Sequence, residues 1–154
     1  MEIMGDLAAL HEQLAEWRNR GERIALVPTM GNLHAGHLAL VEAAAADADH
    51  VVATIFVNPI QFVAGEDFEH YPRSEAEDCR QLDTAGAELV FMPAVETMYP
   101  AGQENHTRVT VPALDGILCG EFRPGHFTGV ATIVTKLLNM IRPDMAFFGE
   151  KDYQ

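Results

Sequence analysis

The stretch that decides the fold is Ile24-Ala-Leu-Val-Pro-Thr-Met-Gly-Asn-Leu-His-Ala-Gly-His-Leu38. Its first four residues form a short apolar run before a proline, which is typical of a strand buried on both faces. The segment 29–33 predicts a tight turn, which Gly31 permits. Apolar residues at helical spacing then run through Leu38, Val41 and Ala45. We therefore expect one strand–turn–helix unit, with its strand ending at Pro28.

Strands and helices alternate on both sides of this unit. The sequence predicts an earlier helix, capped by Asp6 and ended by Gly21, and a helix opened by a capping box of Ser74 and Glu77 that closes near Gly86. Further expected segments are strands at 51–57, 89–92, 107–111 and 145–148, a loop at 58–72, a helix at 128–141 closed by Pro143, and a new helix from 149. This order favours an α/β fold, a Rossmann-like and mostly parallel sheet with flanking helices. Ligands of such sheets bind beyond the carboxyl ends of the strands.

The composition excludes several classes of protein. The 154 residues are 48% hydrophobic and 21% charged, as in one globular domain. The sequence has no apolar run near the roughly 20 residues that cross a bilayer and no secretory signal, and its two cysteines read as reduced thiols. We therefore expect a cytoplasmic protein. Ten basic against 23 acidic residues, a net charge of −13, argue against nucleic acid and anionic membranes and favour small-molecule partners.

Two histidines mark the start of the predicted second helix. His34 and His37 are three residues apart, so they project from one face of the first turn, where backbone N–H groups and the helix dipole favour an anion. Imidazoles there can donate hydrogen bonds to phosphate oxygens. Gly36 leaves no side chain to block a flat ring that approaches the helix. The alternatives are a zinc half-site, for which the nearby sequence offers no further ligands at the usual spacing, and two solvent-facing histidines.

This constellation resembles the HxGH signature of the nucleotidylyltransferase superfamily, whose members activate a substrate by attack on the α-phosphate of ATP. Five segments, in order and in spacing, are similar to the pantothenate synthetase family, the pantoate–β-alanine ligases. The resemblance extends over essentially the whole chain. The segments are Pro28–His34, Phe56–Phe62, Tyr71–Arg73, Arg123–Phe127 and Phe148–Gln154.

The resemblance implies a function and a domain organisation. Members of this family ligate pantoate and β-alanine through a pantoyl-adenylate intermediate, with ATP as a substrate together with Mg²⁺ and with no tightly bound cofactor. Residues 1–154 would be the N-terminal ATP- and pantoate-binding Rossmann-like domain, and the C-terminal domain would be absent from this chain. We therefore expect the fragment to bind substrate but to be catalytically weak or inactive. The resemblance also implies a homodimer.

The resemblance assigns site residues as well. His37, His34 and Lys151 would be the catalytic residues on the phosphates, with His37 as proton donor, and Gly149 and Asp152 would hold the ribose. The full implied ATP-binding set is Met30, Gly31, Asn32, Leu33, His34, Ala35, Gly36, His37, Gly149, Glu150, Lys151 and Asp152.

The acid substrates have their own implied residues. Gln61 would bind pantoate beside the β-alanine site, and Asn58 and Tyr71 would line the pantoate pocket. The alternative interpretation of Asn58 is a loop asparagine that caps its own turn. Arg123 and His126 would order the site or contact substrate, and a structural role is the alternative. No metal ligands are predicted in the protein itself.

Two other functions stay open at this stage. One is another HxGH adenylyltransferase, acting for example on a phosphopantetheine or on nicotinate mononucleotide. The other is a domain that only binds its ligands. An HxGH aminoacyl-tRNA synthetase is disfavoured by the acidic balance of the chain. Pyrophosphate exchange that depends on pantoate alone would separate the enzymatic alternatives.

Overall fold

The protein folds around one parallel sheet, as expected for the α/β class. The structure, a computed structural model, describes residues 1–62 and 74–153. Every pair of neighbouring strands is parallel, and the order across the sheet is β1-β4-β3-β2-β5. The strands are β1 (Glu2–Met4), β2 (Ile24–Thr29), β3 (His50–Ile55), β4 (Leu89–Phe91) and β5 (Met145–Ala146).

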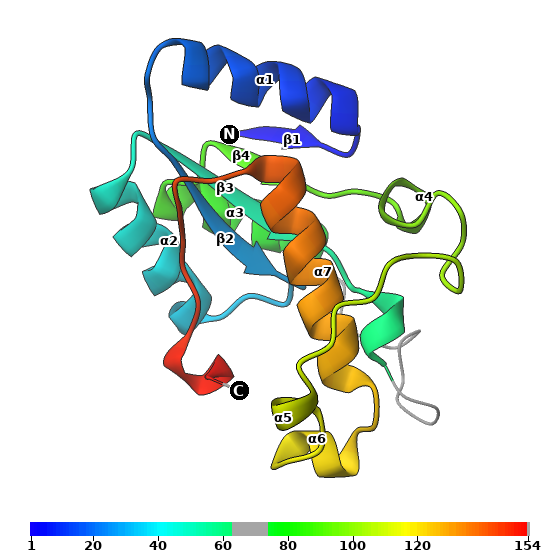
Figure 1. The fold of residues 1–154 in the computed structure, drawn as a ribbon. Helices are drawn as coiled ribbons and strands as arrows, with labels where there is room; N and C mark the ends of the chain where they lie inside the picture. Colours follow the sequence, from blue (N-terminus) through cyan, green and yellow to red (C-terminus); the bar gives the residue numbers. More distant parts are fainter. Residues whose placement is uncertain (63–73, 154) are drawn as a thin grey trace.

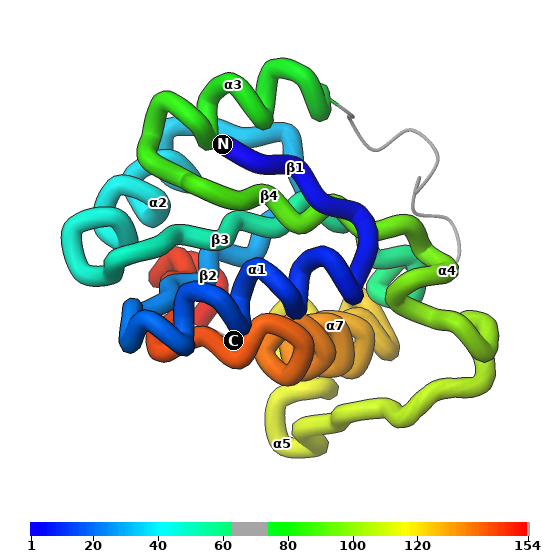
Figure 2. The backbone as a smooth tube through the Cα atoms, turned by 90° about the horizontal axis from the view of Figure 1, so that it is seen from above, coloured from blue at the N-terminus to red at the C-terminus, as the bar shows by residue number. Residues whose placement is uncertain are grey.

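Helices cover both faces of the sheet (Figures 1 and 2). One face packs against α1 (Leu7–Asn19) and α7 (His126–Ile141), and the other packs against α2 (Ala35–Asp47) and α3 (Glu75–Ala85). Successive side chains of β2 alternate between these two cores, which explains why its sequence is apolar throughout rather than at every second residue. Shorter elements complete the fold: η1 (Pro59–Gln61), α4 (Val95–Met98), α5 (Pro112–Asp115), α6 (Cys119–Phe122) and η2 (Glu150–Asp152).

The strand order places a topological switch point between β2 and β5. The chain runs from β2 outward to β3 and then to β4, whereas β5 returns to the opposite side of β2. The turn after β2 and the segment after β5 therefore both leave from the carboxyl ends of the strands. They lie on the two sides of the switch point. In open parallel sheets this position is where ligands bind.

The helix ends confirm some capping predictions and overturn one. Asp6 caps α1, since its Oδ1 accepts a hydrogen bond from the Ala9 N–H at 2.9 Å, and α3 ends at Gly86 in the left-handed conformation (φ 102°). The predicted capping box at α3 is wrong. Ser74 makes no capping hydrogen bond, because its hydroxyl donates to Oδ2 of Asp78 at 2.9 Å.

Strand β2 does not end at Pro28 but runs through it, and Pro28 pairs in register with Thr54 of β3. The carbonyls of Ile24 and Leu26 accept hydrogen bonds from the β5 side. Pro28 is two residues after Leu26, so its backbone faces the same side, and the N–H that proline lacks would point toward β5. The pairing with β5 has already stopped at Ala146. No ladder hydrogen bond is lost, so the proline is tolerated.

Other boundaries differ from the sequence prediction. The segment 107–111 is not a strand: the Val109 N–H donates to Oγ1 of Thr132 at 2.9 Å and joins the segment to α7 instead. Helix α7 begins two residues earlier than expected but ends at Ile141, as predicted, and its C-cap Arg142 is left-handed (φ 45°). Strands β3 and β5 are shorter than predicted, the helix expected from 149 is the three-residue η2, and the edge strand β1 has no counterpart in the prediction. In the part of the chain that the structure describes, no helix is long and apolar enough to span a membrane.

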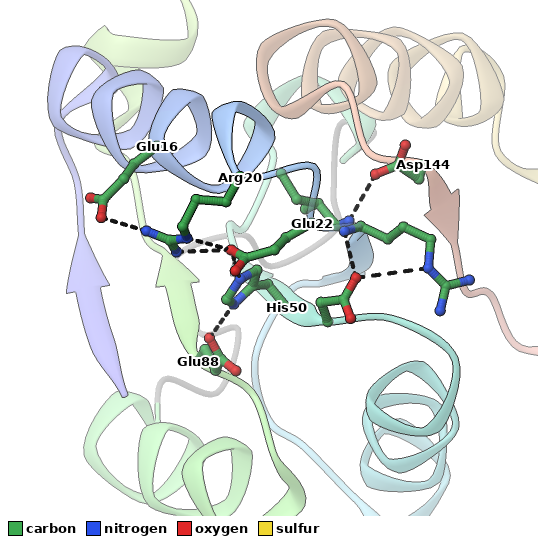
Figure 3. Close-up of polar contacts among 9 residues, drawn as sticks. Glu16, Arg20, Glu22, His50, Glu88 and Asp144 are labelled. Carbon is green, nitrogen blue, oxygen red and sulfur yellow. Dashed lines mark hydrogen bonds and ion pairs between the residues drawn. The ribbon is translucent and has the colours of Figure 1, made fainter.

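At the amino ends of the strands, a histidine at the start of β3 links neighbouring segments through its ring (Figure 3). The His50 ring stacks on Trp17 with the ring centroids 4.1 Å apart, and its two nitrogens contact the carboxylates of Glu22 and Glu88. Burial lowers the pKa of His50, but the hydrogen bonds to the two carboxylates outweigh it, so the pKa lies above its usual value. His50 is thus a structural histidine with partners for both ring nitrogens.

Candidate functional site

The two histidines of the HxGH segment cap the start of α2. His34 is the N-cap residue rather than part of the first turn, and its Nδ1 accepts the Gly36 N–H at 3.1 Å. Nδ1 of His37 lies 3.4 Å from the His34 N–H, and the two ring centroids are 4.1 Å apart. A backbone N–H can only donate, so both Nδ1 atoms accept and each neutral ring carries its proton on Nε2. The cap therefore leaves two Nε2–H donors for a ligand.

Gly36 is required by this arrangement. A Cβ added there would lie 2.9 Å from Cε1 and 3.1 Å from Nδ1 of His34, closer than carbon atoms tolerate. The flat ring that approaches the helix at Gly36 is thus the ring of His34 itself. The glycine lets that ring fold over the first turn of α2.

The segment after β5 lies beside these histidines. Figure 1 shows η2 near the beginning of α2. Burial lowers the pKa of His37, and its electrostatic interactions with His34 and Lys151 lower it further, whereas Asp152 and Asp78 act in the opposite direction. His37 is therefore neutral at neutral pH, and the two halves of the expected nucleotide site lie within electrostatic reach of each other.

Lys151 is held only loosely. Its Nζ lies 2.8 Å from both carboxylate oxygens of Asp152, but the two side chains are 65% and 54% exposed. Exposed ion pairs contribute little to stability, so Lys151 can leave Asp152 for a phosphate at small cost. Gly149 caps η2, and its carbonyl accepts the Asp152 N–H at 2.9 Å. Glu150 is exposed at the start of η2.

The turn between β2 and α2 directs its amides into the protein. The N–H groups of Asn32 and Leu33 each donate to one oxygen of the Asp78 carboxylate at 2.9 Å, and the Gly31 N–H donates to Oγ1 of Thr29 at 3.1 Å. These three amides therefore do not face a ligand in this structure. Ala35 stands at the first position of α2, where the N–H has no intrahelical acceptor.

Asn58 lies in a buried hydrogen-bond network around η1. Its Nδ2 donates to Oε1 of Gln61 and to the carbonyl of Gly129, both at 3.2 Å, and its Oδ1 accepts the Tyr99 hydroxyl at 2.7 Å. The side chain makes no capping hydrogen bond, so the alternative that Asn58 caps its own turn is wrong. Asn58 instead orients Gln61, whose Nε2 lies 2.8 Å from Sδ of Met30.

Arg123 and His126 order the same element. Nε2 of His126 accepts from Nη1 of Arg123 at 2.9 Å, so the ring proton is on Nδ1, which donates to the Gln61 carbonyl at 2.8 Å. These contacts join the start of α7 to η1. Tyr71 lies outside the described residues.

Two cavities lie near these elements. One, of about 180 Å³, is lined by Met30, Gly31 and Asp78 together with residues that follow β3 and β4, at the carboxyl edge of the sheet. A larger one, of about 620 Å³, lies between His11, Lys136 and the segment 99–109. No residue predicted for the site lines the larger cavity, so size alone does not identify the functional site. Among the described residues, no group of three or more potential ligands could hold a metal ion.

Sequence reasoning missed three residues of this site. Asp78 and Thr29 hold the turn, and Tyr99 completes the Asn58 network. Asp78 lies four residues after Ser74, but a capping box pairs Ser74 with the residue three positions on, so the pattern pointed to Glu77. No local pattern distinguishes Tyr99, because its partner is 41 residues away.

A five-stranded parallel sheet with helices on both faces, and with a pair of helix-capping histidines beside its switch point, defines a Rossmann-like α/β domain. The family model described as pantoate-beta-alanine ligase matches residues 2–154. The chain belongs to this family.

Individual relatives agree. The pantothenate synthetases of Aeromonas hydrophila and Chromohalobacter salexigens are 56% and 57% identical to the chain over all 154 residues, which cover 54% of each relative. The crystal structure of pantothenate synthetase from Thermus thermophilus has a TM-score of 0.90 at 47% identity, over 99% of this chain and 53% of that one. A pantoate-beta-alanine ligase from Francisella tularensis, complexed with beta-gamma ATP and β-alanine, has a TM-score of 0.83 at 35% identity, over 95% of this chain and 55% of that one. The chain thus spans about half the length of the relatives it matches.

Proposed function

We propose that this chain forms the ATP- and pantoate-binding half of a ligase that joins pantoate to β-alanine, with release of AMP and pyrophosphate. Family membership supports the reaction, and the Francisella relative was crystallised with an ATP compound and β-alanine. Because the chain spans about half of its relatives, we assign it the N-terminal domain and expect weak turnover or none without the remaining half.

The observation that carries the proposal is the pair of hydrogen bonds by which His34 and His37 cap α2. The α2 cap occupies both Nδ1 atoms, so His34 and His37 offer Nε2–H donors at a helix N-terminus, a position that favours phosphate. Lys151 adds a mobile positive charge from the other side of the switch point. Residues 30–37 and 149–152 then surround the triphosphate and the ribose, with Gly149 and Asp152 on the ribose.

The chemistry requires placement and charge stabilisation more than covalent catalysis. A pantoate carboxylate oxygen attacks the α-phosphorus of ATP, and the bond to the bridging oxygen breaks to release pyrophosphate. The β-alanine amine then attacks the carbonyl of pantoyl adenylate, loses a proton and expels AMP. The two imidazoles stabilise negative charge on the phosphate oxygens in the first step, and His37, which the family resemblance makes the proton donor, acts through a hydrogen bond from its Nε2–H without transferring that proton. Mg²⁺ enters with ATP as part of the substrate.

Gln61 is the residue we propose for pantoate, and we propose Asn58 and Tyr71, the latter outside the described residues, as further residues of the pantoate pocket. The side chain of Gln61 is buried and held by Asn58 on one side and Met30 on the other. A fixed amide of this kind can recognise a hydroxyl or a carboxylate of a small acid. Gln61 therefore connects the pantoate pocket to the turn that precedes the histidines.

Calorimetric titration of MgATP into this chain tests the binding half of the proposal. We expect His34→Ala and His37→Ala to weaken binding at least tenfold, because each removes a donor to phosphate. The matched control is His11→Ala, an exposed histidine on α1 that lies outside the expected site. Equal affinity in all four proteins would contradict the site.

The catalytic half requires a chain extended to the length of the relatives. There we expect pyrophosphate exchange that depends on pantoate alone, lowered roughly 100-fold or more by either histidine substitution. Exchange supported by phosphopantetheine or nicotinate mononucleotide instead of pantoate would identify another adenylyltransferase.

We also propose a cytoplasmic homodimer. The two described cysteines are free thiols, which fits a reducing compartment. Val111, Leu118 and Phe122 are 44%, 69% and 80% exposed within one short segment, an apolar surface that suits a second copy. Sedimentation of the extended chain, with Phe122→Asp as the disrupting variant, tests the dimer; a monomeric wild type would contradict it.

A further inference from the structure

A buried carboxylate on α3 holds the turn that leads into the histidine pair. Asp78 is 2% exposed, and both of its oxygens are bound: Oδ1 accepts the Leu33 N–H, and Oδ2 accepts the Asn32 N–H and the Ser74 hydroxyl, all at 2.9 Å. Asp78 and this turn are more than 40 residues apart in the sequence. The contact therefore exists only in the folded chain.

The chemistry of this carboxylate indicates that it has a specific task. A buried carboxylate requires strong partners, and hydrogen bonds from backbone amides to an ionised acceptor are among the stronger ones in proteins. No ion pair within the described residues involves Asp78, so two amides and one hydroxyl compensate its burial. An apolar residue at this α3 position would fill the same space without such requirements.

The turn that Asp78 binds has an unfavourable backbone. Gly31 and Asn32 are both left-handed, with φ of 80° and 52°, a conformation that costs free energy at the non-glycine residue. A side chain at Gly31 would also crowd the carboxylate, because a Cβ there would lie 3.1 Å from Oδ2 of Asp78. The carboxylate offsets this cost through its two amide hydrogen bonds. His34 follows the turn directly, so the direction of the turn sets where the histidine pair begins.

We propose that Asp78 is a positioning residue for the nucleotide: it fixes the 30–33 turn so that His34 and His37 meet the phosphates. This inference rests on the proposed ATP site, but it assigns a role to a residue that touches no ligand. Two amides that could face an anion are turned inward onto Asp78. The contacts with phosphate are thereby left to the histidine rings and to the first turn of α2.

Amide hydrogen exchange in the unmodified chain tests the anchor directly. We expect the Asn32 and Leu33 amides to be protected to a degree similar to those of β2, whereas the Ala35 amide exchanges fast. Rapid exchange of Asn32 and Leu33 would overturn the inference, and this result does not depend on the folding of any variant.

Asp78→Asn tests the functional consequence. The substitution keeps the size of the side chain but turns one acceptor into a donor that faces a backbone N–H. We expect faster exchange of the Asn32 or Leu33 amide, unchanged protection in β2, and MgATP affinity lowered tenfold or more. Ser74→Ala is the matched control, since it removes the third contact of Asp78 and leaves both amide bonds; we expect affinity within twofold of wild type.

The outcomes separate the two proposals. If the wild-type chain binds MgATP and folded Asp78→Asn binds it within twofold, the positioning role is refuted and the ATP site stands. If the wild-type chain does not bind MgATP, the proposed function fails, and the role of Asp78 toward the nucleotide fails with it. A purely structural role would lower the thermal midpoint of Asp78→Asn without a selective loss of protection in the turn.

Discussion

Gly129→Ala should damage the site through the backbone of η1. Helix α7 crosses η1 so closely that a Cβ at Gly129 would lie 2.6 Å from Cα of Gln61 and 2.8 Å from the carbonyl oxygen of Ile60. Ordinary contact begins at 3.4 Å, so the two elements have to separate by about 1 Å. Both obstructing atoms belong to the backbone, so no side-chain rotation relieves the contact.

The size of the effect follows from three contributions. Overpacking costs about 1–3 kcal/mol. Two hydrogen bonds across this contact, Asn58 to the Gly129 carbonyl and His126 to the Gln61 carbonyl, are stretched, at about 1 kcal/mol each. Alanine in place of glycine in a helix returns about 1 kcal/mol. The net loss of about 2–4 kcal/mol corresponds to a fall of roughly 4–16 °C in the thermal midpoint of a domain of this size.

Differential scanning calorimetry measures this prediction. The control is Gly116→Ala, where φ is −110° and no atom lies within 4 Å of the added Cβ, so its midpoint should stay within about 2 °C of wild type. We also expect Gly129→Ala to retain most MgATP affinity, because Gly129 supports Gln61 rather than the histidine pair. A midpoint for Gly129→Ala equal to that of the control would refute the packing argument.

Three further predictions concern single residues. His50 has a raised pKa in the folded protein, so its charged form stabilises the fold; this contribution is complete below the unfolded pKa near 6.5 and is lost as the pH rises through the folded value. Urea unfolding of wild type and His50→Gln should therefore differ at pH 6 and converge by pH 9, and a difference independent of pH would contradict the charge argument. Tyr99→Phe leaves Oδ1 of Asn58 without its hydroxyl donor, so the free energy of unfolding in the same assay should fall by about 1–3 kcal/mol. An unchanged free energy would contradict this and show that the oxygen finds another donor. Arg142→Gly relieves a left-handed residue that precedes a proline, so the thermal midpoint should rise by about 1–4 °C; a fall would show that the Arg142 side chain is needed.

The sequence was a good guide wherever the deciding interactions are local. Asp6 caps α1, Gly86 ends α3, and the apolar run at β2 is buried on both faces, since each depends on neighbours within a few residues. Local signals also led to errors. Pro28 is a strand breaker in isolation, yet it lies within β2 because β5 ends before reaching it.

The failure at Ser74 and Glu77 has a similar physical origin. The spacing matches a capping box, but Asp78 forms a stronger contact with the Ser74 hydroxyl and is itself held by the turn after β2. A local pattern cannot show a competing partner that comes from another part of the chain. The role of Tyr99 could not be predicted for the same reason, because its partner Asn58 is distant in the sequence.

The residue types and spacing of HxGH, with the four segments that accompany it, were sufficient to predict the parallel α/β fold and the family. These features depend on periodicity and on short motifs, which are set by residues close together in the sequence. The orientation of the site was decided by tertiary contacts: Asp78 turns the amides of the 30–33 turn inward, and the close crossing of α7 over η1 sets Gln61. Hydrogen bonds and packing between distant segments depend on distances that only the folded chain creates.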